Sequence, residues 1–483
     1  MAYWLLTGAT GLLGQYLLRD LLLRGERVCV LTRSSRHRTP QQRIEALFPR
    51  WENELGYRLP RPVILTGELT EPDLGLTVAD QQWLKRNVTG VLHSAASLSF
   101  TAESNGEPYR TNVEGTRNLL ELCHQLALRR FCHISTAYVF GLNCGRFWED
   151  EFDVGQTPAN EYERSKIESE KMVRAASFLD SVTVLRPSII VGDSQSGFTS
   201  TYHGFYAPLQ LICTLIKQGV NDLSPDILER FQLSGTDRKN FVPVDWVSQA
   251  AVRIITNARS TGRTFHLTHP TATTMLTLWE AWATAIMRAA DVAASNTRPT
   301  SANQSVDSIE QFLKTQLDMY RSYWRDDPDF DSSNTQAFTL GLRCPKLDVA
   351  QLVRLCEVAM STRFGMGALG GLPVPPAANG FLPTEIATSS ATDDRALVTV
   401  ELIGTHGTAW QLPLTNFRTT LNAEPNCQGV TVRLASDTWR GIATGQVTSQ
   451  QAISAGQVWI ESQHQPDSGW SAWLQQLILA HVG

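Results

Sequence analysis

The stretch Thr7-Gly8-Ala9-Thr10-Gly11-Leu12-Leu13-Gly14 decides the fold of this chain. It follows a short apolar run, residues 3–6, that predicts a β-strand, and it leads into an apolar-periodic segment that predicts a helix. A strand, a glycine turn and a helix in this order are the context in which such a motif binds a dinucleotide. We expect Gly8 to allow the tight turn, Gly11 to let the backbone approach a pyrophosphate and Gly14 to let the helix pack on the strand. The helix N-terminus then offers free N–H groups to the phosphates.

The composition is that of a soluble globular protein, with 42% hydrophobic and 18% charged residues. A length of 483 residues predicts about two or three domains, and a net charge of -5 gives no electrostatic case for nucleic acid binding. No apolar run approaches the roughly 20 residues that span a bilayer, and no basic leader precedes the glycine turn. We therefore expect a cytoplasmic protein without a transmembrane segment. Eight scattered cysteines predict buried reduced thiols and no metal site.

Short apolar strands alternate with helical patterns after the glycine turn. The predicted strands are residues 27–32, 63–66, 90–94, 130–135 and 182–187, and the clearest helices are residues 112–128 and 161–178. This alternation predicts an α/β fold with a doubly wound parallel sheet that is covered by helices on both faces.

The end of the second strand indicates which dinucleotide is bound. A carboxylate there would bind the ribose 2′-hydroxyl of NAD, but the sequence has no acid and instead carries Arg33, Arg36 and Arg38. The planar fork of an arginine suits a 2′-phosphate, which favours NADPH. The alternative is that these arginines only solvate a loop.

The same region resembles the extended short-chain dehydrogenases/reductases, a family with a Rossmann fold. The resemblance rests on TGATGLLG at 7–14, Gly67-Glu68-Leu69, His93-Ser94-Ala95-Ala96 and Thr111–Thr116. It implies that Glu68 and Leu69 lie near the adenine and that Asn112 lies behind the active site. Together with the motif it gives an expected cofactor site of Thr7, Gly8, Thr10, Gly11, Leu12, Leu13, Gly14, Arg33, Arg36, Glu68, Leu69, Ser94, Ala95, Ala96, Asn112, Lys166, Pro187, Ser188 and Ile190.

A Tyr-x-x-x-Lys pattern predicts the catalytic residues. Tyr162 and Lys166 are four positions apart in a predicted helix and therefore share one face. A free tyrosine titrates near pH ~10, and we expect the neighbouring ammonium to lower that pKa and to improve Tyr162 as an acid and base. The family resemblance adds that Lys166 holds the nicotinamide ribose and that Thr136 supplies the third catalytic group, a hydroxyl. Ser135 is the alternative hydroxyl, and both could merely cap the following turn.

Thr136 and two further segments resemble the thioester reductase and fatty acyl-CoA reductase (male sterility) branch of the family. The segments are residues 186–197, whose backbone would meet the nicotinamide carboxamide, and the aromatic stretch 320–331. The resemblance spans residues 1–364. It implies an NADP-binding reductase domain with a small helical substrate subdomain, built mainly from residues 193–240 and 270–364.

The composition changes beyond residue 364. Residues 365–392 are rich in glycine and proline, which predicts a linker. Residues 393–483 contain short strands at 396–402, 408–414, 429–434 and 457–461, with helices at 436–445, 449–455 and 468–481. This order resembles the sterol carrier protein-2 fold, an α+β domain that encloses a lipid. The alternative is a small docking or dimerisation domain with a filled core.

These features lead to a hypothesis of NADPH-dependent reduction of an acyl thioester or a long-chain carbonyl to the aldehyde or alcohol. The substrate would be carried by CoA or an acyl carrier protein, with the C-terminal domain holding the lipid tail. One alternative is an NAD(P)-dependent dehydrogenase of a sterol or hydroxy-lipid alcohol, which the fold alone does not exclude. Another is a lipid-binding or transfer protein with a regulatory dinucleotide domain, against which the Thr136, Tyr162 and Lys166 set argues.

Overall fold

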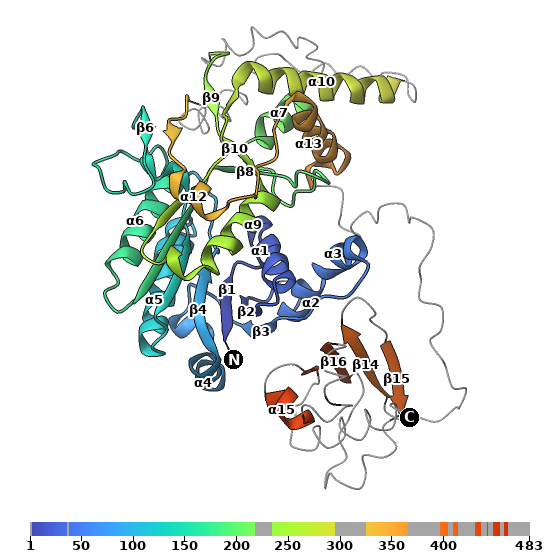
Figure 1. Ribbon diagram of the computed structural model, residues 1–483. Coiled ribbons are helices and arrows are strands. Elements are labelled where there is room, and N and C mark those ends of the chain that lie inside the picture. Colours follow the sequence, from blue (N-terminus) through green and yellow to red (C-terminus); the bar gives the residue numbers. More distant parts are fainter. Residues whose placement is uncertain are drawn as a thin grey trace. The chain divides into compact units, whose positions relative to one another are not determined.

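A computed structural model describes the protein at residues 2–35, 38–217, 234–294 and 325–365, and at 397–403, 409–413, 430–435, 442, 448–454 and 458–461. The chain folds as two units (Figure 1). The larger unit contains residues 2–43 and 64–372, and the smaller one contains residue 1, residues 44–63 and residues 373–483. Each is described by itself.

A seven-stranded sheet forms the centre of the larger unit, in the order β11-β7-β5-β4-β1-β2-β3. Its strands are β1 (Tyr3–Thr7), β2 (Arg27–Thr32), β3 (Val63–Thr66), β4 (Val88–His93), β5 (Arg130–Ile134), β7 (Ser181–Pro187) and β11 (Thr264–Leu267). From β2 through β1, β4, β5 and β7 to β11, each strand runs parallel to its neighbour. The strand order reverses between β1 and β4, and open α/β sheets bind their ligands at the carboxyl ends of such a pair.

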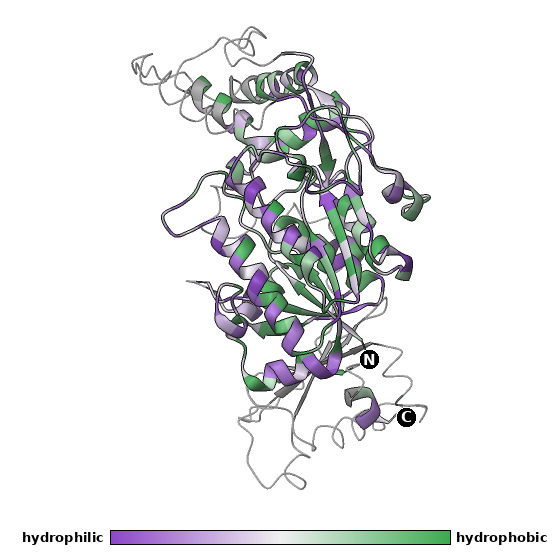
Figure 2. Cartoon of the chain, turned by 90° about the vertical axis from the view of Figure 1, so that its left-hand side faces the viewer, coloured by the Kyte–Doolittle hydropathy of each residue, from purple (hydrophilic) through white to green (hydrophobic). Residues whose placement is uncertain are grey.

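Helices cover both faces of this sheet, as the alternating pattern predicts (Figure 1). α1 (Leu12–Leu23) and α9 (Val244–Ile255) pack together on one side, while α5 (Gly115–Gln125) and α6 (Glu161–Ala175) pack together on the other. The strands consist mainly of hydrophobic residues, whereas hydrophobic and hydrophilic residues alternate along the helices (Figure 2). Shorter elements of the first half of the chain are α2 (Pro40–Glu45), α3 (Phe48–Leu55), η1 (Pro72–Gly75), α4 (Val78–Asn87), η2 (Arg110–Glu114) and η3 (Ala137–Phe140).

A second layer of short strands and helices extends from the carboxyl end of the sheet. Strand pairs join distant parts of the chain: β8 (Ile189–Val191) with β10 (Phe241–Pro243), β9 (Arg238–Lys239) with β12 (Thr273–Thr274), and β6 (Arg146–Phe147) with β13 (Asp329–Phe330). The helices are α7 (Tyr206–Lys217), η4 (Ala258–Ser260), α10 (Met275–Ala294), α12 (Ser333–Phe338), α13 (Val349–Ser361) and η5 (Arg363–Gly365).

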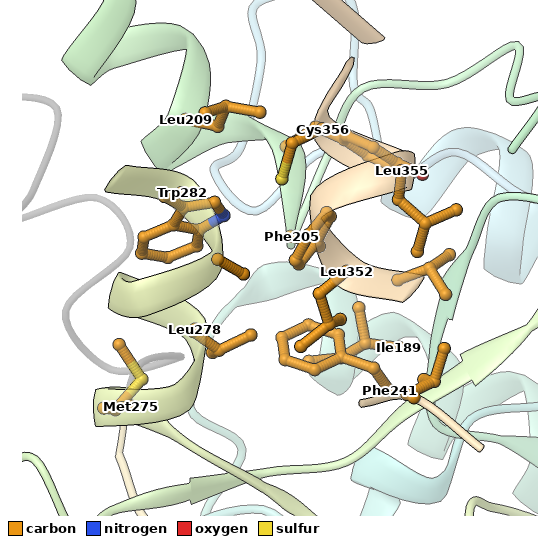
Figure 3. Packing of buried hydrophobic residues seen from close by; sticks show 14 of the residues in the cluster. Ile189, Phe205, Leu209, Phe241, Met275, Leu278, Trp282, Leu352, Leu355 and Cys356 are labelled. Carbon is orange, nitrogen blue, oxygen red and sulfur yellow. The ribbon is translucent and has the colours of Figure 1, made fainter. Parts of the chain in front are cut away.

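An apolar cluster holds this second layer together (Figure 3). α10 buries Met275, Leu278, Trp279, Trp282 and Ile286, a spacing that places all of them on one helical face. They pack with side chains of α7, α13 and β10, including Leu209, Phe241, Leu352 and Cys356. This cluster joins α7, α10, α13 and β10 into one apolar core, and the predicted bounds of a helical substrate subdomain stay a prediction.

The smaller unit contains a four-stranded sheet in the order β15-β14-β16-β17. β14 (Leu397–Ile403) runs antiparallel to β15 (Ala409–Pro413) and parallel to β16 (Val430–Ala435), which runs antiparallel to β17 (Val458–Glu461). These strands and α15 (Ser449–Ser454) agree with the predicted short elements. The expected linker after Gly365 and the expected helix at 468–481 lie outside the described residues, as does the expected helix at 436–445 apart from Ile442. The resemblance to the sterol carrier protein-2 fold stays a prediction.

Across the part of the chain that the structure describes, every helix is too short or too polar to cross a bilayer.

Candidate active site

The glycine turn between β1 and α1 forms an open cradle. Gly8 has a positive φ of 75°, and a Cβ atom there would lie 2.6 Å from the backbone nitrogen of Ala95. A Cβ atom at Gly14 would overlap the carbonyl oxygen of Gly8, so this glycine lets α1 approach the turn. Within the described part of the chain, a Cβ atom at Gly11 would meet only that same oxygen, at 3.4 Å. Packing within the protein therefore requires glycine at positions 8 and 14 but leaves open the space beside Gly11.

The N-terminal end of α1 has no side-chain cap. Gly11 is its N-cap residue, and among the residues that the structure describes no side chain caps the first turn. Uncapped N–H groups at a helix N-terminus are a binding site for phosphate. The open space beside Gly11 and these free donors fit a dinucleotide pyrophosphate.

Thr7 fixes the carboxyl ends of β1 and β4 to each other. Its hydroxyl accepts hydrogen bonds from the backbone N–H groups of Ser94 and Ala95, both at 3.2 Å, and lies 2.8 Å from Nδ1 of His93. Nε2 of His93 lies 3.0 Å from the Thr116 hydroxyl. Burial lowers the pKa of His93 to about 3, so the ring is neutral and serves as a link between strand and helix. Thr7, expected at the cofactor, thus has its hydroxyl engaged within the protein.

Arg43, an arginine on α2, contacts the backbone just after β2, where Arg33 lies. The Arg43 guanidinium on α2 donates hydrogen bonds to the Thr10 hydroxyl at 2.8 Å and to the carbonyl oxygen of Arg33 at 2.7 Å. Arg33 itself pairs with Glu68 at 3.1 Å. Burial, followed by the charge of Arg33, lowers the pKa of Arg43. Sequence reasoning missed Arg43 because only the fold brings α2 to the glycine turn. Arg36 lies outside the described residues.

Thr136 and Tyr162 are brought together by the turn after β5 and the start of α6. The Thr136 side chain caps η3 by accepting a hydrogen bond from the backbone N–H of Tyr138 at 3.2 Å. Asn160 caps α6 in the same way, which places Tyr162 in the first turn of that helix. The Thr136 hydroxyl lies near enough to the Tyr162 phenol to lower its pKa.

The alternative hydroxyl has a different neighbour. Ser135 is buried beside the Glu170 carboxylate on α6. The geometry therefore favours Thr136 over Ser135 as the hydroxyl that acts with Tyr162.

Lys166 faces the end of β5 instead of acting on the phenol of Tyr162. Its Nζ donates a hydrogen bond to the carbonyl oxygen of Ile134 at 2.8 Å. Burial lowers the pKa of Lys166 to about 8, although Glu170 opposes this shift. Burial raises the pKa of Tyr162, and the nearby Thr136 hydroxyl only partly offsets this rise. The expectation that the ammonium lowers the Tyr162 pKa is therefore wrong for the protein without cofactor, because the cost of burying a phenolate dominates.

Asn112 ties the loop after β4 to the catalytic helix. It lies in η2, a single π-helical turn that precedes α5 and that the predicted helix 112–128 did not anticipate. Such turns are frequent at functional sites. The Asn112 amide accepts from the Ser97 N–H at 2.7 Å and donates to the Ser97 carbonyl at 2.9 Å and to the Ser165 hydroxyl at 2.8 Å. Asn112 is thus buried and hydrogen-bonded to α6, the helix that contains Tyr162, and its place behind an active site stays a prediction.

The other expected cofactor residues lie at or just beyond the carboxyl ends of β1, β3, β4 and β7: Leu12, Leu13, Leu69, Ser94, Ala95, Ala96, Pro187, Ser188 and Ile190. Their contacts differ. The Ser188 hydroxyl donates to the Asn240 side chain at 2.7 Å, whereas Leu69 is packed closely against Gly115 of α5. Leu69 is therefore at least partly a core residue.

Residues 6–251 match the protein family described as male sterility protein. The chain belongs to this family. Fatty acyl-CoA reductase 1 of Mus musculus is 29% identical over 281 residues, which are 50% of this chain and 52% of that protein. A component of the linear gramicidin synthase of Brevibacillus parabrevis is 28% identical over 285 residues, 56% of this chain and 5% of that protein. The chain spans about half the length of the curated fatty acyl-CoA reductases that it matches.

The fold of this male sterility family member also matches solved structures. The terminal R domain of the myxalamid PKS-NRPS biosynthetic pathway superimposes with a TM-score of 0.58 and 26% identity, covering 75% of this chain and 92% of that one. The family match and the glycine cradle identify a nicotinamide dinucleotide as the class of cofactor.

Proposed function

We propose that this chain is an NADPH-dependent reductase of an acyl thioester carried by CoA or by a carrier protein. The observation that carries the proposal is that the turn after β5 and the start of α6 bring Thr136 near Tyr162, with Lys166 of α6 hydrogen-bonded to the carbonyl oxygen of Ile134 at the end of β5. The similarity to fatty acyl-CoA reductase 1 and to the R domain supports a thioester as the substrate class.

Bound NADPH would supply the hydride that reduces the thioester carbonyl carbon. Thr136 and Tyr162 would donate hydrogen bonds to the carbonyl oxygen, where negative charge develops, and Tyr162 would then transfer its proton to that oxygen. Because burial raises its pKa, Tyr162 is protonated at neutral pH and is ready to act as the donor. Lys166 would hold the nicotinamide ribose. Loss of the thiol from the resulting hemithioacetal gives the aldehyde, which a second turnover reduces to the alcohol.

The preference for NADPH rests on Arg33 and Arg43. The Arg43 guanidinium contacts Thr10 of the glycine turn, and Arg33 follows β2. Guanidinium groups suit a 2′-phosphate, and no carboxylate ends β2 to bind a free 2′-hydroxyl. Glu68 already pairs with Arg33, which leaves Arg43 as the stronger candidate.

NADPH oxidation with a panel of acyl-CoA and carrier-bound thioesters tests this function. We expect turnover with at least one of them, much weaker turnover with NADH, and loss of turnover in Tyr162→Phe with NADPH binding retained. Retained turnover in Tyr162→Phe would refute its role as the acid. Oxidation of a sterol or hydroxy-lipid alcohol with NADP, without reduction of any thioester, would instead support the alcohol dehydrogenase.

We further propose that residues 393–483 hold the lipid tail of the substrate. The support is the resemblance of the order of strands and helices to a lipid-binding fold, together with the four-stranded sheet. Lipid that co-purifies with the full chain can be identified by mass spectrometry, and its absence would favour a docking or dimerisation role.

A further inference from the structure

A buried ion pair lies next to the turn that carries Thr136. Nζ of Lys239 donates to Oδ1 of Asp327 at 2.5 Å, and their side chains are 0% and 1% exposed. Oδ2 of Asp327 accepts hydrogen bonds from the Asn240 N–H and from the Tyr138 hydroxyl, both at 2.7 Å. The carboxylate therefore receives three donors from two separate parts of the chain.

Tyr138 connects this ion pair to Thr136. Its hydroxyl binds Asp327, and its backbone N–H donates to the Thr136 hydroxyl oxygen. The Lys239 ammonium lies 5.1 Å from the centroid of the Tyr138 ring. Because the Thr136 hydroxyl oxygen accepts from the backbone, its own proton can be donated to another group, and the Tyr162 phenol is a neighbour whose pKa it lowers.

One short stretch of chain holds both ends of the turn after β5. The Arg325 guanidinium donates a hydrogen bond to the carbonyl oxygen of Gly141, and its Cζ atom lies 5.2 Å from the centroid of the Phe140 ring. Two residues further on, Asp327 accepts a hydrogen bond from the Tyr138 hydroxyl. This stretch is 184 or more residues away in sequence. The turn from Thr136 to Gly141 is thus fixed by residues of the helical subdomain.

Stability of the fold alone does not explain why Lys239 and Asp327 are buried as an ion pair. Burying two charges removes their hydration, and a buried ion pair often stabilises a protein no more than apolar residues of the same size. A fully hydrogen-bonded buried network does, however, select one geometry of the groups that it joins. The group at the end of this network is Thr136.

We propose that Asp327, Lys239 and Tyr138 are positioning residues for the catalytic hydroxyl of Thr136. The ion pair fixes the Tyr138 hydroxyl, Tyr138 fixes the turn, and the turn aims the Thr136 hydroxyl at Tyr162 and at the substrate oxygen. The inference rests on the proposed function. It adds three positioning residues to the proposed catalytic residues Thr136, Tyr162 and Lys166.

Tyr138→Phe tests the link because it removes one oxygen atom and leaves the ring and the ion pair in place. We expect kcat to fall on the order of 10-fold to 100-fold with KM for the thioester nearly unchanged, since a small displacement of a catalytic group lowers the rate of the chemical step. The matched control is Tyr3→Phe, which removes a hydroxyl at the start of β1, at the opposite end of the strands from Thr136. It should leave kcat unchanged. A kcat equal to that of the wild type in Tyr138→Phe would overturn the proposal.

A second readout needs neither substrate nor turnover. With tyrosine labelled at Cζ with ¹³C, the Tyr162 resonance, assigned by its loss in Tyr162→Phe, reports the hydrogen bond at its phenol oxygen. We expect this resonance to shift in Tyr138→Phe and to stay in place in Tyr3→Phe. An unmoved resonance would overturn the proposal whatever the kinetics show, whereas absence of turnover in the wild type would contradict only the proposed function.

The ion pair is tested by removing both charges together. Lys239→Met combined with Asp327→Leu leaves no unpaired buried charge, so the fold should survive, as a thermal melt will check. We expect the double variant to shift the Tyr162 resonance and lower kcat as Tyr138→Phe does, with no further effect when Tyr138→Phe is added. Independent, multiplicative effects on kcat would show that the ion pair does not act through Tyr138.

Discussion

The pKa of Glu163, the residue that follows Tyr162 in the sequence, is raised by its buried position. Glu163 is only 2% exposed. Its carboxylate accepts a hydrogen bond from the Ala159 N–H at 2.7 Å. Burial raises the pKa of Glu163 from 4.5 to about 7, although Ala159, Arg325 and Lys239 oppose the shift. Near neutral pH this group therefore exchanges a proton within reach of the network that positions Thr136.

Glu163→Gln should change how stability depends on pH. The folded protein binds the Glu163 proton more tightly than the unfolded chain, so this stabilising contribution is complete below pH 4.5 and is lost as the pH rises through about 7. Glutamine resembles the protonated carboxyl at every pH. The variant should match the wild type at pH 4.5 and exceed it by about 3 kcal/mol in free energy of unfolding at pH 8, measured by urea denaturation.

Glu161→Gln is the matched control for that measurement, because its side chain is 41% exposed and lies on the same helix. We expect its difference from the wild type to be the same at both pH values. A Glu163→Gln variant that is no more stable than the wild type at pH 8 would show that the carboxyl is not neutral in the folded protein.

At the scale of elements, we expect two glycines of the turn between β1 and α1 to differ in role: Gly14 is required for packing, whereas Gly11 is required for cofactor binding. Alanine at Gly14 would overlap the Gly8 carbonyl oxygen, whereas alanine at Gly11 fits the backbone, whose φ is -77°. We expect Gly14→Ala to lose about 1–3 kcal/mol of stability or more, as overpacked sites do. Gly11→Ala should keep its stability within about 1 kcal/mol while weakening NADPH binding, which calorimetric titration measures. Wild-type affinity in Gly11→Ala would mean that the pyrophosphate does not approach this residue.

Apolar runs beside turns or helices predicted the strands β1, β2, β3, β4, β5 and β7 of the main sheet. They missed β11, whose four residues include Thr264 and His266 and form no apolar run. The Tyr-x-x-x-Lys spacing predicted Tyr162 and Lys166, and the family resemblance predicted Thr136. Their catalytic roles stay predictions. The short pairs such as β6 with β13 have two residues per strand and partners far away in sequence, so no periodicity marks them. Arg43 and Asp327 were missed for the same reason, since only tertiary contacts give them their neighbours.

At the scale of the whole molecule, a shortened chain that lacks residues 373–483 still contains residues 44–63, and it can function only if this segment stays folded. This segment belongs to the same unit as residues 373–483, but it also has contacts among its own residues. Arg61 pairs with Glu45 at 2.9 Å and with Glu52, and its guanidinium lies 3.9 Å from the centroid of the Phe48 ring. These internal contacts predict that the segment keeps its fold when the C-terminal residues are removed.

Removal of residues 373–483 should therefore separate the chemistry from the handling of the acyl chain. Thr136, Tyr162, Lys166 and the glycine turn all belong to the larger unit. We expect a chain of residues 1–372 to reduce a short-chain acyl-CoA with the same kcat/KM as the full chain. For a long-chain acyl-CoA its kcat/KM should fall several-fold, because burial of each additional CH₂ contributes about 0.8 kcal/mol to binding. An equal loss for both chain lengths would indicate that residues 373–483 stabilise the reductase unit, and no loss for either would exclude a role in holding the acyl chain.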